Sequence, residues 1–302
     1  MSIARYDEVA AASSLTAKEF IGIFKPRIAV AIMFSALGGM AITPGILPSL
    51  NQILVFGVSL FLASGAAGAF NQWAEADLDA SMPRTAGRPF ASGRLQPDLT
   101  WLIGITCLLA LSVAMVALAT NSWAAIYTFL GAFTYAIVYT VWLKRKTWLN
   151  IVVGGLAGSF AVLAGAASVE PRLTMESVLL AVVLFLWTPP HFWSLAIAAR
   201  KDYETNKVPM LPVVFGDQIS AHVILVHTIV LSLIALLPAF YGMGLVYTVF
   251  AILGGALFTC TSVRLVLEPT RRRAIENFLA SLLQLSLLLT GIVLDRFIGL
   301  VA

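Results

Sequence analysis

Nine long apolar segments run through this chain, and they limit the folds that it can adopt. A helix needs about 20 apolar residues to cross the hydrocarbon core of a bilayer. Within that core every backbone polar group must find its partner inside the protein, which favours helices over open sheets. The segments predicted to span the membrane are 28–47, 53–79, 99–119, 123–143, 150–168, 174–199, 219–240, 243–265 and 277–299.

The overall composition agrees with this interpretation. Charged residues make up 11% of the chain, whereas soluble domains carry about 25%. We therefore predict an all-α integral membrane protein with nine transmembrane helices around a central cavity. Residues 1–27 are predicted to form a cytoplasmic N-terminal segment, and residues 28–302 a single transmembrane domain.

Basic residues are distributed unevenly between the two sides of the predicted bundle. Of the 19 lysines and arginines, only Arg172 and Arg296 fall on the side opposite the N-terminus. Because cytoplasmic loops carry an excess of Lys and Arg, we expect the N-terminus in the cytoplasm and the C-terminus outside. The runs 144–146 and 271–273 could also act only as topology signals and as contacts to anionic lipids.

The C-terminal end of the second span carries a column of polar side chains. Asn71, Glu75 and Asp79 are spaced four residues apart, which places them on one face of a helix, whereas Asp77 points elsewhere. A charge inside a membrane costs roughly 2.5–3.5 kcal/mol on insertion scales, so acids that persist there favour a functional site. Oxygen ligands of this kind suit Mg²⁺. The alternative, a plain helix end, is disfavoured because acids at a helix C-terminus oppose the helix dipole.

An arginine-rich loop follows directly after this column. Arg84, Arg88 and Arg94 lie in a segment that also contains two glycines. Arginine binds phosphate oxygens through two parallel N–H groups, so acids followed by arginines suggest a metal-bound diphosphate. The alternative is an ordinary basic cytoplasmic loop.

A second polar motif ends the sixth span. Pro189 and Pro190 are expected to break the helix there, and His191 directly after them is an ionisable residue inside the membrane. Asp202 and Asn206 are again four residues apart, like a weaker copy of the first motif. Mixed charges around them leave a solvated turn at the membrane interface as the alternative.

These residues resemble the UbiA superfamily of intramembrane prenyltransferases, whose first motif is Asn-x-x-x-Asp-x-x-x-Asp. More narrowly, the chain resembles the protohaem IX farnesyltransferase family in the Pro-Pro-His-Phe-Trp stretch at 189–193 and the Val-Pro-Met-Leu-Pro stretch at 208–212. Further matching segments are 25–28, 71–79, 139–140, 143–147, 154–158 and 202–203. The chain departs from the family pattern where Glu75 replaces Asp, 159–161 replaces common prolines and Lys207 replaces Gly.

The resemblance implies transfer of a farnesyl group from farnesyl diphosphate to a vinyl group of haem B, with addition of water, giving haem O. The first acidic motif would then be 71–94 and the second 187–214. The implied catalytic residues are Asn71, Glu75, Asp79, Asp202 and His191, and the implied Mg²⁺ ligands are Asn71, Glu75, Asp79 and Asp202. The implied diphosphate-binding residues are Arg84, Arg88, Lys144, Arg145, Lys201 and Tyr203. For His191, ligation of the haem iron, stabilisation of a cation and a hydrogen bond to a propionate all stay open.

Other functions remain as alternatives at this point. The nearest is a UbiA-type enzyme that prenylates an aromatic quinone precursor. A transporter with two pseudo-repeats and broken helices, or a haem-binding membrane subunit using the three histidines, would leave the acids and arginines unexplained. The expected partners are farnesyl diphosphate, haem B and the lipid bilayer, with no nucleic acid. A haem A synthase or a cytochrome oxidase assembly factor is a further candidate partner, and a bacterial inner membrane is favoured over a mitochondrial one.

Overall fold

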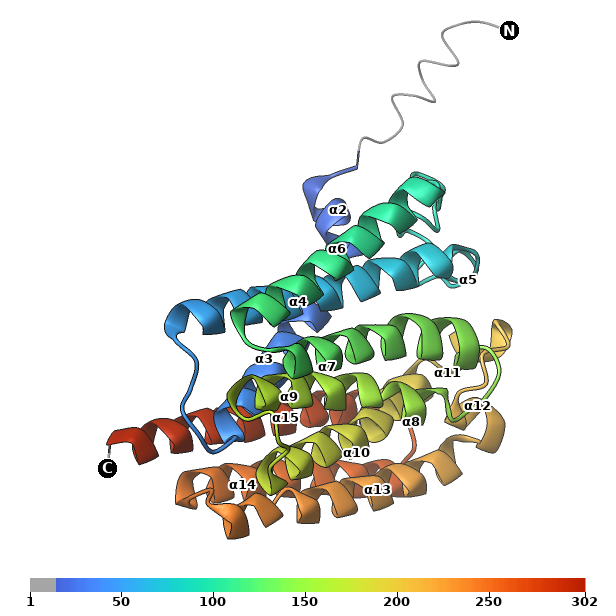
Figure 1. Ribbon diagram of the computed structural model, residues 1–302. Coiled ribbons are helices and arrows are strands. Elements are labelled where there is room, and N and C mark those ends of the chain that lie inside the picture. The colour runs from blue at the N-terminus through green and yellow to red at the C-terminus, as the bar shows by residue number, and fades with distance from the viewer. Residues whose placement is uncertain (1–14, 302) are drawn as a thin grey trace, which may run out of the picture.

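The computed structural model describes residues 15–301, and every regular element in that range is a helix (Figure 1). Within that range, eight helices are long and apolar enough to cross a membrane. Helices α2 (Ala17–Ile23) and α3 (Pro26–Ile42) meet at a bend of 48° and together pass the same test as a ninth span. The prediction of an all-helical protein that crosses a membrane several times is confirmed. The side of each terminus, the boundary at residue 28 and the central cavity stay predictions.

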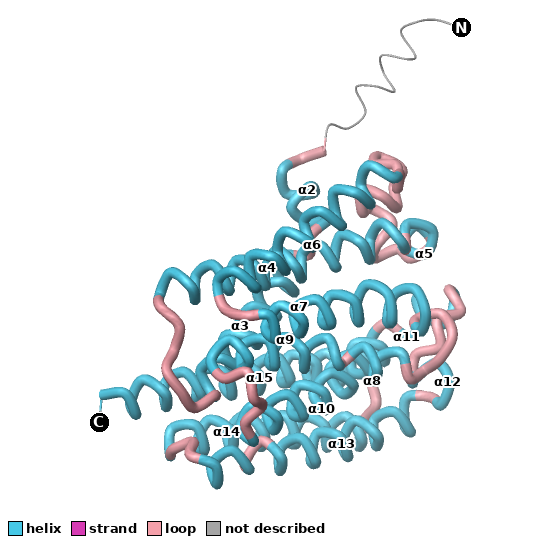
Figure 2. The backbone as a smooth tube through the Cα atoms, viewed as in Figure 1, coloured by secondary structure: helices cyan, strands magenta, loops and turns pink. Residues whose placement is uncertain are grey.

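The remaining spans follow in chain order and are joined by loops and short helices (Figure 2). They are α4 (Leu50–Ala74), α6 (Leu99–Ala119), α7 (Ser122–Phe133) with η1 (Thr134–Leu143), α8 (Asn150–Gly154) with α9 (Leu156–Val169), α10 (Met175–Ala198), α13 (Asp217–Ile234) with η2 (Leu237–Tyr241), α14 (Leu245–Leu267) and α15 (Arg271–Val301). Three short helices lie between them: α5 (Ala76–Ala80), α11 (Arg200–Thr205) and α12 (Leu211–Phe215).

Several spans begin where a polar side chain caps the helix. Ser49, Asp98, Asn121 and Thr174 each accept a hydrogen bond from a backbone N–H in the first turn of the helix that follows. Such caps satisfy donors that would otherwise have no partner at a helix start. The caps therefore fix where these spans begin, at 50, 99, 122 and 175, against predicted starts at 53, 99, 123 and 174.

Glycines allow a close crossing between α3 and α9. Where α3 meets α9, a Cβ on Gly165 would overlap the Ala36 carbonyl oxygen, and a Cβ on Gly39 would overlap that of Val162. Glycine at such a crossing allows two helix backbones to approach closely in a membrane. This contact fixes α3, and with it the α2–α3 bend, against the middle of the bundle.

Two predicted details of the spans are wrong. The second span is not one helix, because α4 ends at Ala74 and α5 starts at Ala76 with Glu75 between them at φ −112° and ψ 20°. The sixth span is one helix, because α10 continues through Pro189 and Pro190. Neighbouring helices can support a proline-containing span, and here Trp187 Nε1 donates to the Ser281 carbonyl of α15 at 2.9 Å.

The polar motifs gather at one end of the bundle. Helices α5, α11 and α12 all lie at the right-hand end in Figure 1, whereas α15 ends at the opposite, left-hand end. The loops that follow α4, η1 and α10 in the chain therefore meet at one end of the bundle.

Candidate functional site

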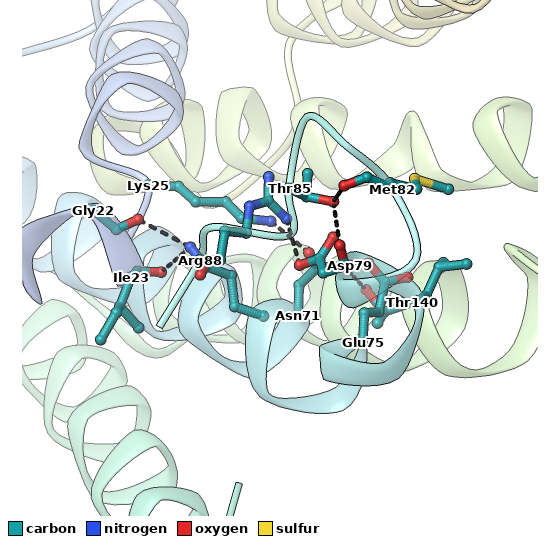
Figure 3. Close-up of polar contacts among 12 residues, drawn as sticks. Gly22, Ile23, Lys25, Asn71, Glu75, Asp79, Met82, Thr85, Arg88 and Thr140 are labelled. Carbon is teal, nitrogen blue, oxygen red and sulfur yellow. Dashed lines mark hydrogen bonds and ion pairs between the residues drawn. The ribbon is translucent and has the colours of Figure 1, made fainter. Parts of the chain in front are cut away.

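The predicted polar column exists and is buried. Asn71, Glu75 and Asp79 are 3%, 1% and 4% exposed, respectively. Asn71 Nδ2 donates to Glu75 Oε2 at 2.9 Å (Figure 3). The four-residue repeat survives the end of α4, because the Glu75 N–H still bonds to the Asn71 carbonyl and the Asp79 N–H to the Glu75 carbonyl.

Each member of the column is held by one basic side chain, and each of these comes from a different segment. The pairs are Lys25 Nζ with Asn71 Oδ1 at 2.5 Å, Lys144 Nζ with Glu75 Oε2 at 2.5 Å, and Arg88 Nη1 with Asp79 Oδ2 at 2.6 Å. A buried charge is costly unless it is paired. Lys144 and Arg88 therefore make the two buried acids tolerable, and all three bases surround the column with N–H donors.

Lys25 was not among the predicted site residues. It lies between α2 and α3 with φ 48° and ψ 56°, a left-handed conformation that is unfavourable for a residue with a Cβ. Gln72 Nε2 donates to the Gly22 and Ile23 carbonyls at 3.0 and 3.2 Å and so holds the end of α2 in place. In the sequence Lys25 is one more basic residue on the cytoplasmic side, and only the Lys-Pro step at the start of a span could have marked it.

The arginine-rich loop after α5 divides its three arginines between different tasks. Arg88 pairs with the column, whereas Arg94 bonds to Glu19 of α2 at 2.6 Å and to the Gly87 carbonyl at 2.8 Å. Arg84 is exposed and has no ion pair among residues 15–301. Arg88 and Arg84 therefore remain candidates for phosphate binding, while Arg94 ties the loop to α2.

Asp77 points away from the column, as predicted, and it engages Arg145. Two hydrogen bonds of 2.9 and 2.7 Å join the Arg145 guanidinium to the two Asp77 oxygens. These bonds lower the pKa of the Asp77 carboxyl below its ordinary value. Arg145, which the sequence suggested for diphosphate binding, is thus committed to Asp77 in this structure.

The end of the fourth span is a π-helix, η1, rather than the predicted α-helix. Its Tyr135 hydroxyl accepts a hydrogen bond from Lys25 Nζ at 3.0 Å. Its Thr140 hydroxyl accepts one from Asn71 Nδ2 at 2.9 Å. The rings of Tyr135 and Tyr139 stack with centroids 5.8 Å apart, and Lys144 Nζ lies 5.8 Å from the Tyr139 centroid. Wide helical turns of this kind are frequent at functional sites. The sequence identified neither the π-helix nor the roles of Tyr135 and Thr140.

The second motif lies against the first at the same end. Ser81, next to α5, hydrogen-bonds Asn206 next to α11, and Tyr203 belongs to one buried cluster with Leu78 and Met82. Burial raises the pKa of the Tyr203 hydroxyl above its ordinary value, and the nearby Arg84 opposes that effect.

Two other predicted residues of the second motif are not joined to the column. Asp202 is partly exposed and Lys201 is exposed. In the part of the chain that the structure describes, no hydrogen bond or ion pair connects either side chain to Asn71, Glu75 or Asp79. The roles assigned to Asp202 and Lys201 therefore stay predictions.

His191 is part of α10, and its side chain packs against α15. Its Nδ1 is 2.7 Å from Ser281 Oγ, and its ring stacks on Trp187 and Phe278 with centroids 4.2 and 4.4 Å away. None of these partners belongs to the polar column. His222 and His227 each bond through Nδ1 to a carbonyl four residues earlier in α13, a local helix contact.

The donor set of the column fits Mg²⁺. Glu75 Oε1 is buried and has no hydrogen-bond partner. Mg²⁺ prefers oxygen ligands and takes one or two carboxylates together with substrate phosphates and water. Among the described residues no group of three or more His, Cys, Asp and Glu could hold a metal ion by itself. The column therefore suits a cation that takes several of its ligands from a bound phosphate.

The chain belongs to the UbiA prenyltransferase family, whose sequence model matches residues 32–288. Its relatives define the branch of that family. The "Protoheme IX farnesyltransferase 2" of Paramagnetospirillum magneticum is 50% identical over 282 residues, 93% of this chain and 98% of that protein. The "Protoheme IX farnesyltransferase" of Rhizobium johnstonii is 40% identical over 253 residues, 83% of this chain and 79% of that protein. The resemblance seen in the sequence is confirmed.

Solved structures of the same fold agree. A structure of digeranylgeranylglyceryl phosphate synthase has a TM-score of 0.76 at 16% identity, covering 92% of this chain and 98% of that one. A UbiA homologue from Archaeoglobus fulgidus bound to DMAPP and Mg²⁺ has a TM-score of 0.70 at 14% identity, covering 89% and 99%. At these identities the likeness establishes the fold.

Proposed function

We propose that this protein transfers a farnesyl group from farnesyl diphosphate to a vinyl group of haem B, with addition of water, giving haem O. One observation carries the proposal: a relative named for protohaem IX farnesylation is 50% identical over nearly the whole chain. The buried column of oxygens surrounded by cations supports it, because the reaction must stabilise a diphosphate as it leaves.

The reaction breaks one bond of farnesyl diphosphate and forms two bonds at the vinyl group. The allylic C–O bond of farnesyl diphosphate breaks, and the diphosphate leaves with the electron pair. The terminal carbon of the vinyl group bonds to the farnesyl carbon, and the adjacent vinyl carbon takes a hydroxyl from water while one proton is released. The site must therefore place fixed positive groups at the leaving diphosphate. It must also keep water away from the farnesyl cation until the new carbon–carbon bond has formed.

In this proposal Asn71, Glu75 and Asp79, together with Asp202, hold Mg²⁺. When bound, the metal ion neutralises negative charge on the diphosphate oxygens and makes it a better leaving group. The Glu75 oxygen that lacks a hydrogen-bond partner supports this assignment.

Three basic side chains that now pair with the column supply donors to the diphosphate: Lys25, Arg88 and Lys144. Charge-assisted hydrogen bonds to phosphate are roughly twice as strong as neutral ones. Arg84 is exposed next to them and can join. Lys201, Tyr203 and Arg145 are proposed as more peripheral diphosphate contacts.

His191 is proposed to act on the haem side of the site. Because its Nδ1 is engaged by Ser281 Oγ, contact with the haem iron, a propionate or the farnesyl cation would use Nε2. The rings of Trp187 and Phe278 hold the imidazole in one plane, which suits any of the three roles.

The proposed location is a bacterial inner membrane, with the column at the cytoplasmic face. The basic residues at 84–94, 144–146 and 200–207 support this orientation, because positive loops stay in the cytoplasm. On the family resemblance alone, a haem A synthase or an oxidase assembly factor that receives the product is the proposed partner.

The test is mass spectrometry of haem extracted from membranes with and without this protein. We expect a new haem whose mass exceeds that of haem B by one farnesyl group and one water. Unmodified haem in both samples would reject the proposal, and a prenylated aromatic acid in its place would favour a quinone-precursor enzyme.

A further inference from the structure

We propose that Thr140 is a positioning residue, which turns the Asn71 carboxamide so that its oxygen faces the cation site. The inference rests on the proposed function, since it concerns how Asn71 holds Mg²⁺. Four contacts around the Asn71 and Thr140 side chains carry it. Figure 3 shows Lys25, Asn71, Glu75 and Thr140.

The Thr140 hydroxyl has a single proton to donate. Thr140 Oγ1 donates that proton to the Tyr135 carbonyl oxygen at 2.9 Å. A hydroxyl has one proton to give and two lone pairs that accept. Thr140 can therefore only accept from Asn71, whose Nδ2 lies 2.9 Å away.

The hydrogen-bond partners of the Asn71 amide define its orientation. The nitrogen and oxygen ends of an amide are told apart by their hydrogen-bond partners. Nδ2 faces two acceptors, Thr140 Oγ1 and Glu75 Oε2, each at 2.9 Å. Oδ1 faces the Lys25 ammonium, which can only donate, at 2.5 Å. A rotation by 180° would set the amide NH₂ against an ammonium and the amide oxygen against a carboxylate.

The orientation matters because only the oxygen of a carboxamide binds Mg²⁺. Glu75 and Lys25 also touch the amide, but the Glu75 carboxylate is a proposed metal ligand and the Lys25 ammonium a proposed diphosphate contact, so both gain other partners when substrate binds. The Thr140 hydroxyl lies outside the proposed ligand set, so it can hold Nδ2 whether or not a cation is bound. Partners of metal ligands typically change metal affinity 10–100-fold when they are removed.

The π-helix explains why Thr140 lies on the same face of η1 as Tyr135 and Lys144. At about 100° per residue, an α-helix would place Thr140 about 140° from Tyr135, and Lys144 about 180° from it. A π-helix has about 4.4 residues per turn, which brings both within about 50° of Tyr135. The bond from the Lys144 N–H to the Tyr139 carbonyl at 2.9 Å spans five residues and shows that the wide turn extends to Lys144. The wide turns thus align Tyr135, Thr140 and Lys144 toward the column.

The experiment compares Thr140→Val with Thr140→Ser in the full chain, purified in detergent. Thr140 is 4% exposed, and valine keeps its shape while removing the hydroxyl. Isothermal titration of Mg²⁺, in the presence of the unreactive analogue farnesyl S-thiolodiphosphate, measures the metal affinity. We expect Thr140→Val to weaken Mg²⁺ binding about tenfold or more and Thr140→Ser to stay within about twofold of the wild type.

Thr128→Val is the matched control. Thr128 is also buried in the fourth span, at 3% exposure, and its hydroxyl donates to the Ala124 carbonyl of its own helix. We expect wild-type Mg²⁺ affinity in this variant. Thr140→Ala provides the same loss of the hydroxyl if valine prevents folding, as judged by thermal unfolding.

Wild-type Mg²⁺ affinity in folded Thr140→Val or Thr140→Ala would overturn the inference, and so would an equal loss in Thr128→Val. The proposed function is tested separately. If the wild type produced haem O while Thr140→Val bound Mg²⁺ normally, only the inference would fail. If the wild type bound Mg²⁺ and the analogue but left haem B unchanged, only the proposed function would fail.

Discussion

Asn71, Glu75 and Asp79 of the first acidic motif lie buried at the end of α4, whereas Asp202 and Asn206 of the second lie in and next to the short helix α11 at the same end of the bundle. Both contain polar residues four apart followed by basic residues. In the first motif, every side chain of the column meets a base from another segment. In the second, Asn206 bonds to Ser81 and to the Asp202 carbonyl, and Asp202 itself is partly exposed.

The difference teaches that spacing alone does not distinguish a site from its surroundings. A buried acid needs a partner within reach, so its surroundings are constrained by energy. A partly exposed acid is solvated and imposes little on its neighbours. The first motif therefore carries the larger expected effects.

The largest effect is expected for Asp79→Asn. This change removes one of the two carboxylates of the column and leaves Arg88 without its ion pair. We expect haem O formation to fall at least about 100-fold, as for the loss of a metal ligand or its partner, while the protein still inserts and folds. Haem O formed from haem B, farnesyl diphosphate and Mg²⁺ is the measurement.

Asp77→Asn is the control for that experiment. It makes the same chemical change two residues away, on a side chain that bonds to Arg145 outside the column. Activity within about threefold of the wild type is expected. Full activity of Asp79→Asn, or equal losses in both variants, would remove the distinction between the column and its exposed neighbour.

Lys25→Gln should have the next largest effect. Lys25 Nζ bonds both Asn71 and Tyr135 in the buried site, and we expect its loss to lower kcat/KM for farnesyl diphosphate about 10- to 100-fold. Lys201→Gln, at an exposed position of the second motif, should change it less than about twofold. Similar values for the two variants would contradict the special place given to Lys25.

Asp202→Asn directly compares the two motifs. Because Asp202 is partly exposed and not joined to the column, we expect a loss of about tenfold, clearly smaller than for Asp79→Asn. The same assay over a series of Mg²⁺ concentrations measures it. A loss as large as that of Asp79→Asn would mean that the second motif is an equal partner once substrate is bound.

The smallest effect is expected for Lys207→Gly, at one of two lysines with a strained backbone. Lys25 and Lys207 are the two non-glycine residues with positive φ among residues 15–301, at 48° and 53°. Lys207 is exposed and stands where related enzymes were expected to have glycine. We expect Lys207→Gly to raise the free energy of unfolding by about 0.5–1 kcal/mol without loss of activity.

The same change at Lys25 should lower the activity of the enzyme. Lys25→Gly relieves the same backbone strain but removes the ammonium that holds Asn71. Thermal unfolding and haem O formation, measured on both variants, separate the two effects. We expect Lys25→Gly to lose haem O formation, and an active Lys25→Gly enzyme would contradict the role given to the Lys25 ammonium.

Much of the molecule was predictable because the signals are local. Apolar length predicted the spans, and the four-residue repeat predicted that Asn71, Glu75 and Asp79 share a face. The continuity of α10 across Pro189 and Pro190 was not predictable, since it depends on the contacts of α10 with neighbouring helices. The end of α4 at Ala74 was missed as well, because nothing in the local pattern marks Glu75 as a break.

The sequence by itself determined that this is a multi-pass membrane protein with paired acids and arginines, and its motifs indicated the family. Hydropathy and spacing are properties of residues that are close in the sequence, so they can be analysed without knowing the fold. Only the tertiary structure decided which base meets which member of the column, because Lys25 and Lys144 lie 46 and 69 residues from Asn71 and Glu75. It also decided the π-helical turn that brings Thr140 and Lys144 to the column, because a change from 3.6 to about 4.4 residues per turn is set by packing and leaves no periodic mark in so short a segment.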